Sequence, residues 1–437
     1  MQYEIKKGKE FRQSIVTINE YDDDNYCDIF ATKLKFTDEV APKGIELTDL
    51  SNDGDGSVVG WFEGDIYKIS TQAKGQKVIF NEDCGYMFCN CGLKKIINLN
   101  MVDTSNVKNM KGMFWNCAEL SELDLSSFNT SNVKDMSEIF YECERVTNLD
   151  LRSFETSNVE NMSWMFKGCE NLKELDLSHF DTSQVKYMHG MFSTNPNLEK
   201  INLYNFNTSS VENMGNMFKG CVSLQELDLS NFDTSNVTYM SGMFENCDKL
   251  KQLDLSNFDT SQVKYMDGMF AGCKNLRELD LSHFNTAKVE HMGYMFNDCH
   301  NLEKLDISGF NTSKVEYMSH MFCECKKLTN LNLSGFDTSQ VYWSMSRMFA
   351  NCENLESLDL SSFDTSRVAD MSEMFDDTSK LTKEGLNTSD KYILSLFNEE
   401  KGRESEKAFA YENINPKNLK MNKGKEMQKD KGIDKEN

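Results

Sequence analysis

Proline is scarce in this sequence, basic residues are outnumbered by acidic ones, and long apolar runs are missing. Its 437 residues include 3 prolines, and 47 lysines and arginines stand against 70 aspartates and glutamates, for a net charge of −23. This charge repels phosphate backbones and acidic headgroups, so nucleic acid and acidic membrane surfaces are not expected as partners. No stretch approaches the roughly 20 apolar residues of a membrane span, so no transmembrane segment is predicted.

Targeting signals are also missing from both ends of the sequence. The opening residues, MQYEIKKGKEFRQSIV, contain no apolar run of signal-peptide length and no small-residue cleavage site. The closing residues, GIDKEN, carry no anchor or address motif. Taken alone, these ends lead us to expect a soluble chain that stays in the cytoplasm.

The known catalytic and cofactor motifs are absent as well. The sequence has no glycine-rich phosphate loop, no G-x-S-x-G, no H-E-x-x-H and no C-x-x-C pair. Residues 49–60, DLSNDGDGSVVG, begin like an EF-hand loop, but Gly60 replaces the bidentate glutamate, which favours a glycine-rich hairpin turn. The 6 histidines form no cluster with cysteine that would complete a zinc site. We therefore expect no enzyme, no cofactor and no metal site.

What the sequence does contain is a repeat of fixed period. A phenylalanine in an S-x-F step recurs every 26 residues, and after the last of these the next one, Phe363, follows at 27 because of an extra residue near Trp343. Such a period predicts a solenoid of stacked coils, about eleven of them here. The regularly spaced positions are Phe128, Phe154, Phe180, Phe206, Phe232, Phe258, Phe284, Phe310 and Phe336.

Each repeat unit has two halves of different periodicity. In Leu123-Asp124-Leu125 the leucines alternate with an acidic residue, as in a half-buried strand. Residues 107–117 place Val, Met, Met, Phe and Cys at spacings of 3, 3, 1 and 3, which predicts one face of a short α-helical or 3₁₀ segment. The expected fold is therefore of the α/β class, with a parallel strand and a short helical segment in each coil.

Methionine and cysteine are concentrated on the second half of the unit. Twenty-two of 26 methionines fall in two columns, and ten of 14 cysteines fall in one. Core packing is the favoured interpretation, because both side chains are adaptable and mostly buried. Disulfides between coils and a soft-metal array are the alternatives, but parallel Cβ vectors suit a disulfide poorly. The cysteine column is Cys91, Cys117, Cys143, Cys169, Cys221, Cys247, Cys273, Cys299, Cys325 and Cys352.

The unit LDLSNFDTSNVTYMSGMFENC at 227–247 resembles the repeats of BspA-like leucine-rich-repeat surface proteins of bacteria, which also occur in mycoplasma surface proteins. Residues 51–71 resemble the cap that precedes such repeats. The resemblance implies a non-catalytic, adhesin-like surface protein that contacts host or matrix proteins. The sequence departs from ordinary leucine-rich repeats at one position, where phenylalanine stands in place of the asparagine that forms a ladder along the stack. We expect the Thr column, from Thr104 to Thr365, to satisfy the turn backbone instead.

Two exposed columns are candidate partner-binding sites. The strand column is acidic and should attract cations or a basic partner, unless its carboxylates only bond to local turn amides. The second column precedes the first methionine and is rich in aromatic residues, which suit a protein or glycan contact unless the rings only cover neighbouring coils. The acidic column holds Asp124, Asp150, Asp176, Asp228, Asp254, Asp280, Asp306 and Asp359; the aromatic one holds Tyr187, Tyr239, Tyr265, His291 and Tyr317, with Tyr294 and His320 three residues further on.

Three parts of the chain are predicted. Residues 1–83 contain β-branched and aromatic alternation and are expected to form a β-rich cap, 84–381 the solenoid, and 382–437 a closing helix at 391–400 followed by a charged, disordered tail. A monomer is expected. Two functions remain open: an adhesin-like surface protein, as the resemblance implies, and an intracellular binding scaffold, which the missing signal and buried thiols favour.

Overall fold

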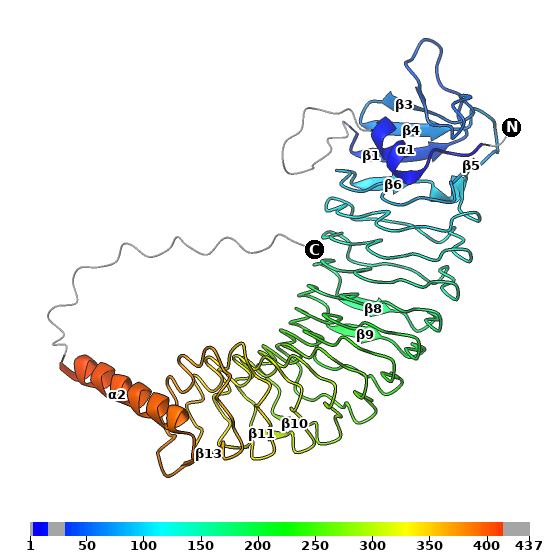
Figure 1. Ribbon diagram of the computed structural model, residues 1–437. Helices are drawn as coiled ribbons and strands as arrows, with labels where there is room; N and C mark the ends of the chain where they lie inside the picture. Colours follow the sequence, from blue (N-terminus) through cyan, green and yellow to red (C-terminus); the bar gives the residue numbers. More distant parts are fainter. Residues whose placement is uncertain (1–2, 16–30, 414–437) are drawn as a thin grey trace.

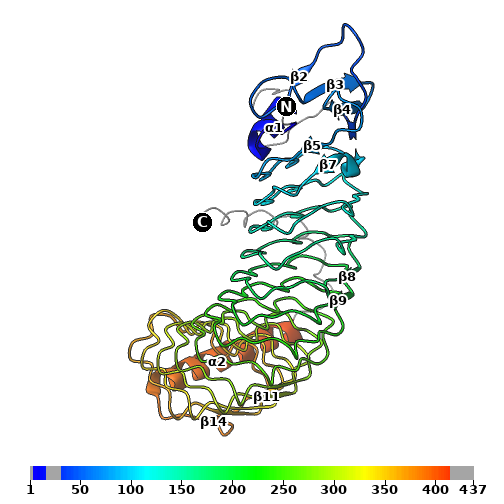
Figure 2. The same ribbon diagram turned by 90° about the vertical axis from the view of Figure 1, so that its right-hand side faces the viewer.

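The chain forms a curved stack of coils with a small sheet at one end and a helix at the other (Figure 1). The computed structural model describes residues 3–15 and 31–413. Turned by 90°, the same stack is seen to bend between its two ends (Figure 2). The solenoid predicted from the 26-residue period is thus present, and it is built from many short strands and few helices.

A five-stranded sheet closes the N-terminal end. Its order is β2-β3-β4-β1-β6, with β3 antiparallel to β2 and β4, and with β1 parallel to β4 and β6. The hairpin turn predicted at 49–60 connects β2 to β3. Strand β6 joins the sheet to the stack. The elements are α1 (Gly8–Ile15), β1 (Lys33–Thr37), β2 (Thr48–Asp49), β3 (Val59–Glu63), β4 (Ile66–Ser70), β5 (Val78–Ile79), β6 (Lys95–Ile97), η1 (Leu99–Met101) and β7 (Val102–Asp103).

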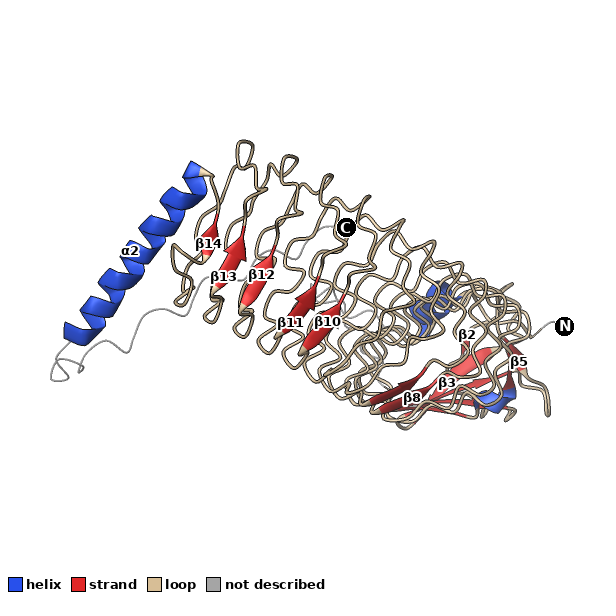
Figure 3. Ribbon diagram, turned by 90° about the horizontal axis from the view of Figure 1, so that it is seen from below, coloured by secondary structure: helices blue, strands red, loops and turns tan. Residues whose placement is uncertain are grey.

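The leucine–aspartate half of the unit forms short parallel strands along one side of the stack (Figure 3). Leu279 pairs with Leu305 one 26-residue unit later, whereas Leu331 pairs with Leu358, which absorbs the extra residue. In β10 the leucine is buried and its flanking residues face solvent, as predicted, whereas the central residues of β9 and β11 are partly buried. The strands are β8 (Glu174–Asp176), β9 (Lys200–Asn202), β10 (Glu278–Asp280), β11 (Lys304–Asp306), β12 (Asn330–Asn332), β13 (Ser357–Asp359) and β14 (Leu386–Asn387).

The second half of the unit is not helical, so the predicted helical segment is wrong. Residues 104–390, all of which the structure describes, contain no helix. The segment begins instead with a column of single parallel bridges that runs coil to coil from Asp83↔Asn109 to His291↔Tyr317. Successive tight turns follow each bridge.

Two kinds of backbone hydrogen bond alternate in these turns. The Gly112 amide donates to the Ser137 carbonyl of the next coil at 2.8 Å, while the Met113 amide donates to Met110 of its own coil at 3.1 Å. Gly112 and Asn116 have φ of 55° and 52°, a left-handed conformation that a helix excludes but that glycine and asparagine tolerate. The turns therefore project apolar side chains to one face without helical geometry.

The threonine column satisfies the backbone between the two halves, as predicted. Thr208 is fully buried, and its hydroxyl donates to the Asp233 carbonyl at 2.8 Å. The same oxygen accepts the Asp233 amide at 2.8 Å. One hydroxyl thus pairs a donor and an acceptor of the next coil, a task that the usual asparagine ladder would otherwise perform.

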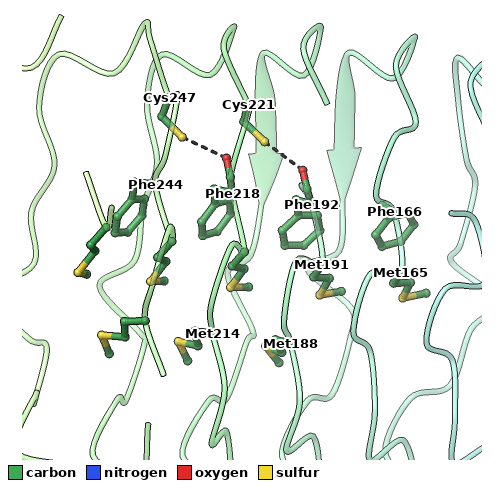
Figure 4. Close-up of a cluster of buried hydrophobic side chains, with 14 of the residues drawn as sticks. Met165, Phe166, Met188, Met191, Phe192, Met214, Phe218, Cys221, Phe244 and Cys247 are labelled. Carbon is green, nitrogen blue, oxygen red and sulfur yellow. Dashed lines mark hydrogen bonds between the residues drawn. The ribbon is translucent and has the colours of Figure 1, made fainter. Parts of the chain in front are cut away.

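Columns of identical side chains fill the core (Figure 4). Phe166 and Phe192 stack with ring centroids 5.9 Å apart, and neighbouring phenylalanines from Phe88 to Phe375 stack at 5.5–5.9 Å. The methionines Met188 and Met191 are fully buried beside them. All thirteen cysteines that the structure describes are buried. Core packing of methionine and cysteine is therefore the correct interpretation.

Helix α2 (Lys391–Asn413) covers the last coil. Its side chains, and that of Asp390 directly before it, replace groups that a further coil would supply. The Phe375 amide, whose equivalents donate to a carbonyl of the next coil, donates to Glu400 Oε2 at 2.7 Å. Thr365 donates to Asp390 Oδ2 at 2.7 Å, and the Phe397 ring meets Phe375 edge-on at 5.4 Å.

The helix predicted at 391–400 is present but continues well past the point where disorder is predicted. The reason is that its next turn is anchored: Lys401 donates to the Thr378 carbonyl and lies 3.0 Å from Glu404. For 401–413 the prediction of disorder is therefore wrong. Residues 414–437, also predicted to be disordered, lie outside the described residues.

Candidate functional site

Most of the predicted aromatic column forms a continuous row of rings. Its members stand at successive bridges, so that backbone pairing fixes their spacing. Ring centroids are 5.4 Å apart for Tyr239–Tyr265, 5.4 Å for Tyr265–His291 and 6.2 Å for His291–Tyr317. Tyr294 and His320 add a second row, stacked at 4.5 Å. These six residues are called the aromatic ridge below.

Glycines on neighbouring coils make room for the ridge. A Cβ on Gly215 would lie 2.5 Å from Tyr239 Cδ1, and one on Gly293 would lie 2.2 Å from Tyr317 Cε1. The rings of the two tyrosines therefore lie directly against bare glycine backbone, and both residues are half-buried. The ridge is both a cover for neighbouring coils and a fixed platform of rings. Those glycines were not singled out in the sequence, although the G-x-M steps that begin at Gly215 and Gly293 are their visible signal.

Tyr187, the remaining member of the predicted column, lies apart from the continuous row of rings. Tyr187 is 43% exposed, and Asn213 separates it from Tyr239 in the bridge column. His189, which sequence reasoning did not select, bridges that gap from another position: it meets Tyr239 at 6.2 Å and Trp164 at 4.4 Å. Burial lowers the pKa of His189, so its ring is neutral at pH 7.

A half-buried carboxylate underlies the ridge. Asp267 Oδ1 accepts the Gly293 amide at 3.1 Å, and its other oxygen lies 3.8 Å from His291 Nδ1. Burial raises the pKa of Asp267. Burial is also the main cause that raises the pKa of Tyr317 to about 12, so this hydroxyl keeps its proton and can donate.

The extra residue extends the aromatic surface beyond the ridge. Trp343 is 61% exposed, and its ring lies 5.8 Å from that of Tyr342, which is 40% exposed. The Tyr342 hydroxyl donates to Glu316 at 2.9 Å. The insertion is visible in the sequence as a 27-residue interval, but the exposure of the two rings required the structure. A buried-core explanation does not apply to them.

The acidic column lies on the strand side, about half a coil from the ridge. Asp228 Oδ1 accepts the Ser230 amide at 3.0 Å, and this turn recurs through the column. Local bonding to turn amides is therefore real, yet all eight carboxylates keep solvent exposure. Hydrogen bonds from the serine two residues on lower the pKa of most of them, and Arg152 lowers that of Asp150 to about 2. The turns are made by Asp124, Asp150, Asp176, Asp228, Asp254, Asp280, Asp306 and Asp359.

One group of carboxylates has ligand spacing for a metal ion. Single oxygens of Asp376, Asp377 and Glu404 lie within 4.8 Å of one another where the last coil meets α2. Lys401 Nζ is 3.0 Å from Glu404, so that carboxylate already has a cationic partner. Exposed acidic groups of this kind are common, and the cluster carries no assignment.

No described helix is both long enough and apolar enough to cross a membrane.

Comparison with known proteins connects the repeats to one family. The model of a family described as "Mycoplasma protein of unknown function, DUF285" matches residues 82–200, 162–278, 246–343 and 301–399. No curated protein matches the chain.

Several solved structures are similar to the chain at 15% identity. A leucine-rich repeat protein from Bacteroides ovatus matches over 86% of this chain and 98% of its own, with a TM-score of 0.39. A leucine rich cell surface protein from Faecalibacterium prausnitzii matches over 86% and 93%, with a TM-score of 0.40. The Toll–Spatzle complex of Drosophila matches over 72% and 42%, with a TM-score of 0.23.

Proposed function

The chain belongs to the DUF285 family of Mycoplasma proteins, and we propose that it acts as a non-catalytic, adhesin-like surface protein that contacts host or matrix proteins. Its leucine-rich-repeat fold is that of a protein-interaction module, a class that is generally non-enzymatic. The observation that supports the proposal is the aromatic ridge with its extension at Trp343.

The ridge suits a protein partner because its rings are preorganised. Tyrosine and tryptophan supply large contact areas and lose little conformational entropy on binding, more so when neighbouring coils already hold them. The edge-on contact of Tyr265 with His291 and the stack of Tyr294 on His320 leave ring surface at half-exposed positions. Exposed aromatic residues of this kind are the usual anchors of protein interfaces.

An intracellular scaffold is the second candidate function, and the thiols favour it. Each of nine column cysteines donates its S–H to a carbonyl of the preceding coil, as Cys221 does to Phe192 at 3.1 Å. A reducing compartment keeps thiols in the donor form that this ladder needs. The two candidates share the ridge and differ in location.

Protease shaving of intact source cells separates the two. We expect peptides from 84–381 to be released while a cytoplasmic marker protein stays inside. Release of these peptides only after lysis would exclude the surface protein and leave the scaffold.

The ridge itself is tested by adherence of the labelled full chain to cultured animal cells. Asn213 occupies the ridge position in its own coil, so Tyr265→Asn is compatible with the fold. Paired with Trp343→Ser, it should reduce adherence by at least about 30-fold, since a single interface anchor contributes about 2 kcal/mol. The matched control is Tyr392→Asn on α2, an exposed tyrosine away from the ridge, which should leave adherence unchanged. Equal adherence of all three proteins would contradict a role for the ridge.

A further inference from the structure

Large side chains occupy one repeat position in three successive coils, on the side of the stack that the tight turns form. Trp115, Tyr141 and Lys167 each follow the core phenylalanine of their coil, and all three are half-buried. The Trp115 and Tyr141 rings stack with centroids 5.6 Å apart. The Lys167 ammonium lies 4.7 Å from the centroid of the Tyr141 ring and donates to the Tyr141 hydroxyl at 2.8 Å. The three side chains therefore form a short column beside the core.

A second ring holds the same ammonium. Lys167 Nζ lies 4.8 Å from the centroid of the Trp164 ring, which belongs to its own coil. A Cβ on Gly190 would lie 2.0 Å from Trp164 Cε3, so the indole rests against bare backbone of the next coil. Cation–π attraction to both rings thus fixes the position of the charge. Tyr141, Trp164 and Lys167 are called the lysine cluster below.

Lys167 lacks the carboxylate partner that comparable lysines have. Five lysines of the coils are half-buried, and four of them form ion pairs, as Lys219 does with Glu245 at 3.0 Å. Lys167 is the fifth, and it forms no ion pair with a carboxylate of the described residues. A fixed ammonium on an acidic protein is thus left open to a carboxylate from outside. The ion-paired lysines are Lys111, Lys219, Lys274 and Lys326.

The rings around Lys167 also favour an anion over a cation. Trp115 and Lys167 cover Tyr141 from the preceding and the following coil, so the edge of that ring, the positive part of its quadrupole, remains for contact. His189, whose ring lies 4.4 Å from that of Trp164, adds no charge, because burial lowers its pKa and Lys167 lowers it further. Lys167 is therefore the charged member of this surface, and a carboxylate complements it.

We propose that the lysine cluster is a docking site for a glutamate or aspartate side chain of the partner protein that contacts the aromatic ridge. The site rests on the proposed function and names one chemical feature of that partner. Continuity with the ridge supports it, because His189 meets Trp164 at 4.4 Å and Tyr239, the first ridge residue, at 6.2 Å. Charge complementarity selects the occupant, since an ammonium and a carboxylate form a charge-assisted hydrogen bond.

The net charge of −23 makes the test selective, because the protein as a whole repels an acidic peptide and diffuse attraction cannot imitate a site. The probe is a fluorescein-labelled hexaglutamate peptide. Its binding to the full chain is measured by anisotropy at about 0.15 M salt, where the Debye length is about 8 Å. We expect saturable binding of hexaglutamate and none of hexaglutamine with the same label.

Variants of the cluster have a matched control in the chain. Lys167→Gln removes the charge and should weaken binding about tenfold, whereas Lys167→Arg keeps the charge and should bind within about threefold of the unmodified protein. Lys219→Gln is the control: Lys219 occupies the same repeat position but is paired with Glu245, so binding should stay within about twofold. Tyr141→Asn places there the residue that Asn297 provides in its own coil, and should weaken binding about threefold.

Equal binding by Lys167→Gln and Lys219→Gln would overturn the proposal, and so would hexaglutamate binding that does not saturate. Thermal unfolding confirms that each variant is folded. Adherence to cultured cells should also fall for Lys167→Gln; a fall for the paired Tyr265→Asn and Trp343→Ser changes alone would overturn the lysine cluster and keep the ridge. Saturable binding that depends on Lys167, together with solenoid peptides released only after lysis, would exclude the adhesin and keep the lysine cluster.

Discussion

The Cys221 thiol donates a hydrogen bond to the Phe192 carbonyl, one coil earlier, at 3.1 Å. Where the cysteine column is interrupted, Asn195 takes the same role, and its amide donates to the Phe166 carbonyl at 2.9 Å. The column is therefore defined by a buried donor as well as by apolar volume. Burial raises the pKa of Cys221 to about 12, which keeps the thiol protonated.

Replacing this thiol should destabilise the stack. We expect Cys221→Ala to lower the free energy of unfolding by about 1–3 kcal/mol, because the Phe192 carbonyl loses one of its two side-chain donors, the other being Asn195 Nδ2, and a small cavity opens. Urea denaturation followed by circular dichroism measures the effect. Cys221→Ser keeps a donor and should lose less; a larger loss for serine than for alanine would contradict the hydrogen-bond role.

Restoring the column should have the opposite effect. Asn195 is fully buried, and its Oδ1 has no hydrogen-bond partner among the described residues. Asn195→Cys removes that oxygen and keeps a donor for the Phe166 carbonyl, so the free energy of unfolding should rise by about 1–3 kcal/mol. A fall in the urea midpoint would show that the amide is needed for another reason.

The threonine ladder should be sensitive to loss of its hydroxyl alone. Thr208→Val keeps the shape of the side chain but leaves the amide and the carbonyl of Asp233 without this buried partner. We expect a loss of about 2–6 kcal/mol, since each of the two unsatisfied groups costs about 1–3 kcal/mol. Thr208→Ser keeps the hydroxyl and is the control. Equal urea midpoints for the valine and serine variants would refute the ladder.

Alkaline pH should destabilise the protein through the thiols. The pKa of Cys169, Cys221 and Cys273 rises on folding from 9.0 to about 12, so their contribution is complete below pH 9 and is lost as the pH rises toward 12. Above pH 9 the unfolded chain binds fewer protons, and each thiol lowers the free energy of unfolding by about 1.4 kcal/mol per pH unit. Urea midpoints under reducing conditions at pH 8 and 10.5 should differ accordingly, and by less in Cys221→Ser.

Helix α2 should depend on one carboxylate. Glu400 is 1% exposed and accepts the Phe375 amide, so Glu400→Ala leaves the last coil open. We expect faster proteolysis near 375–390, with the N-terminal sheet unaffected. Glu400→Gln keeps an oxygen acceptor and should resist cleavage as the unmodified protein does. Identical cleavage rates for all three proteins would exclude this capping contact.

Much of the fold can be predicted from the sequence because every coil must bury the same apolar columns and satisfy the same backbone groups. The 26-residue period, the buried columns and the threonine ladder all follow from spacing and side-chain chemistry. The helical segment was predicted wrongly because its 3, 3, 1, 3 spacing fits successive turns equally well. Gly112 and Asn116, which recur as Gly242 and Asn246, were the visible sign of left-handed turns.

The candidate site was harder to predict. The aromatic column is visible in the sequence, but the contact of His189 with Tyr239 depends on how turns project side chains from different positions. Likewise, the 27-residue interval located the insertion near Trp343 without showing that its ring faces solvent. Whether an aromatic residue at a given repeat position is buried or exposed depends on whether the adjacent coil has a glycine against its ring, as Gly293 lies against Tyr317.

The way in which α2 closes the stack also bears on how the molecule can change in length. Asp390, Phe397 and Glu400 engage a threonine, a phenylalanine ring and a phenylalanine amide, positions that recur from coil to coil. Because α2 and Asp390 contact positions that every coil provides, they would also close a stack that had gained or lost whole units by unequal recombination. Variation in steps of one coil would alter the reach of the binding surface and leave both ends intact.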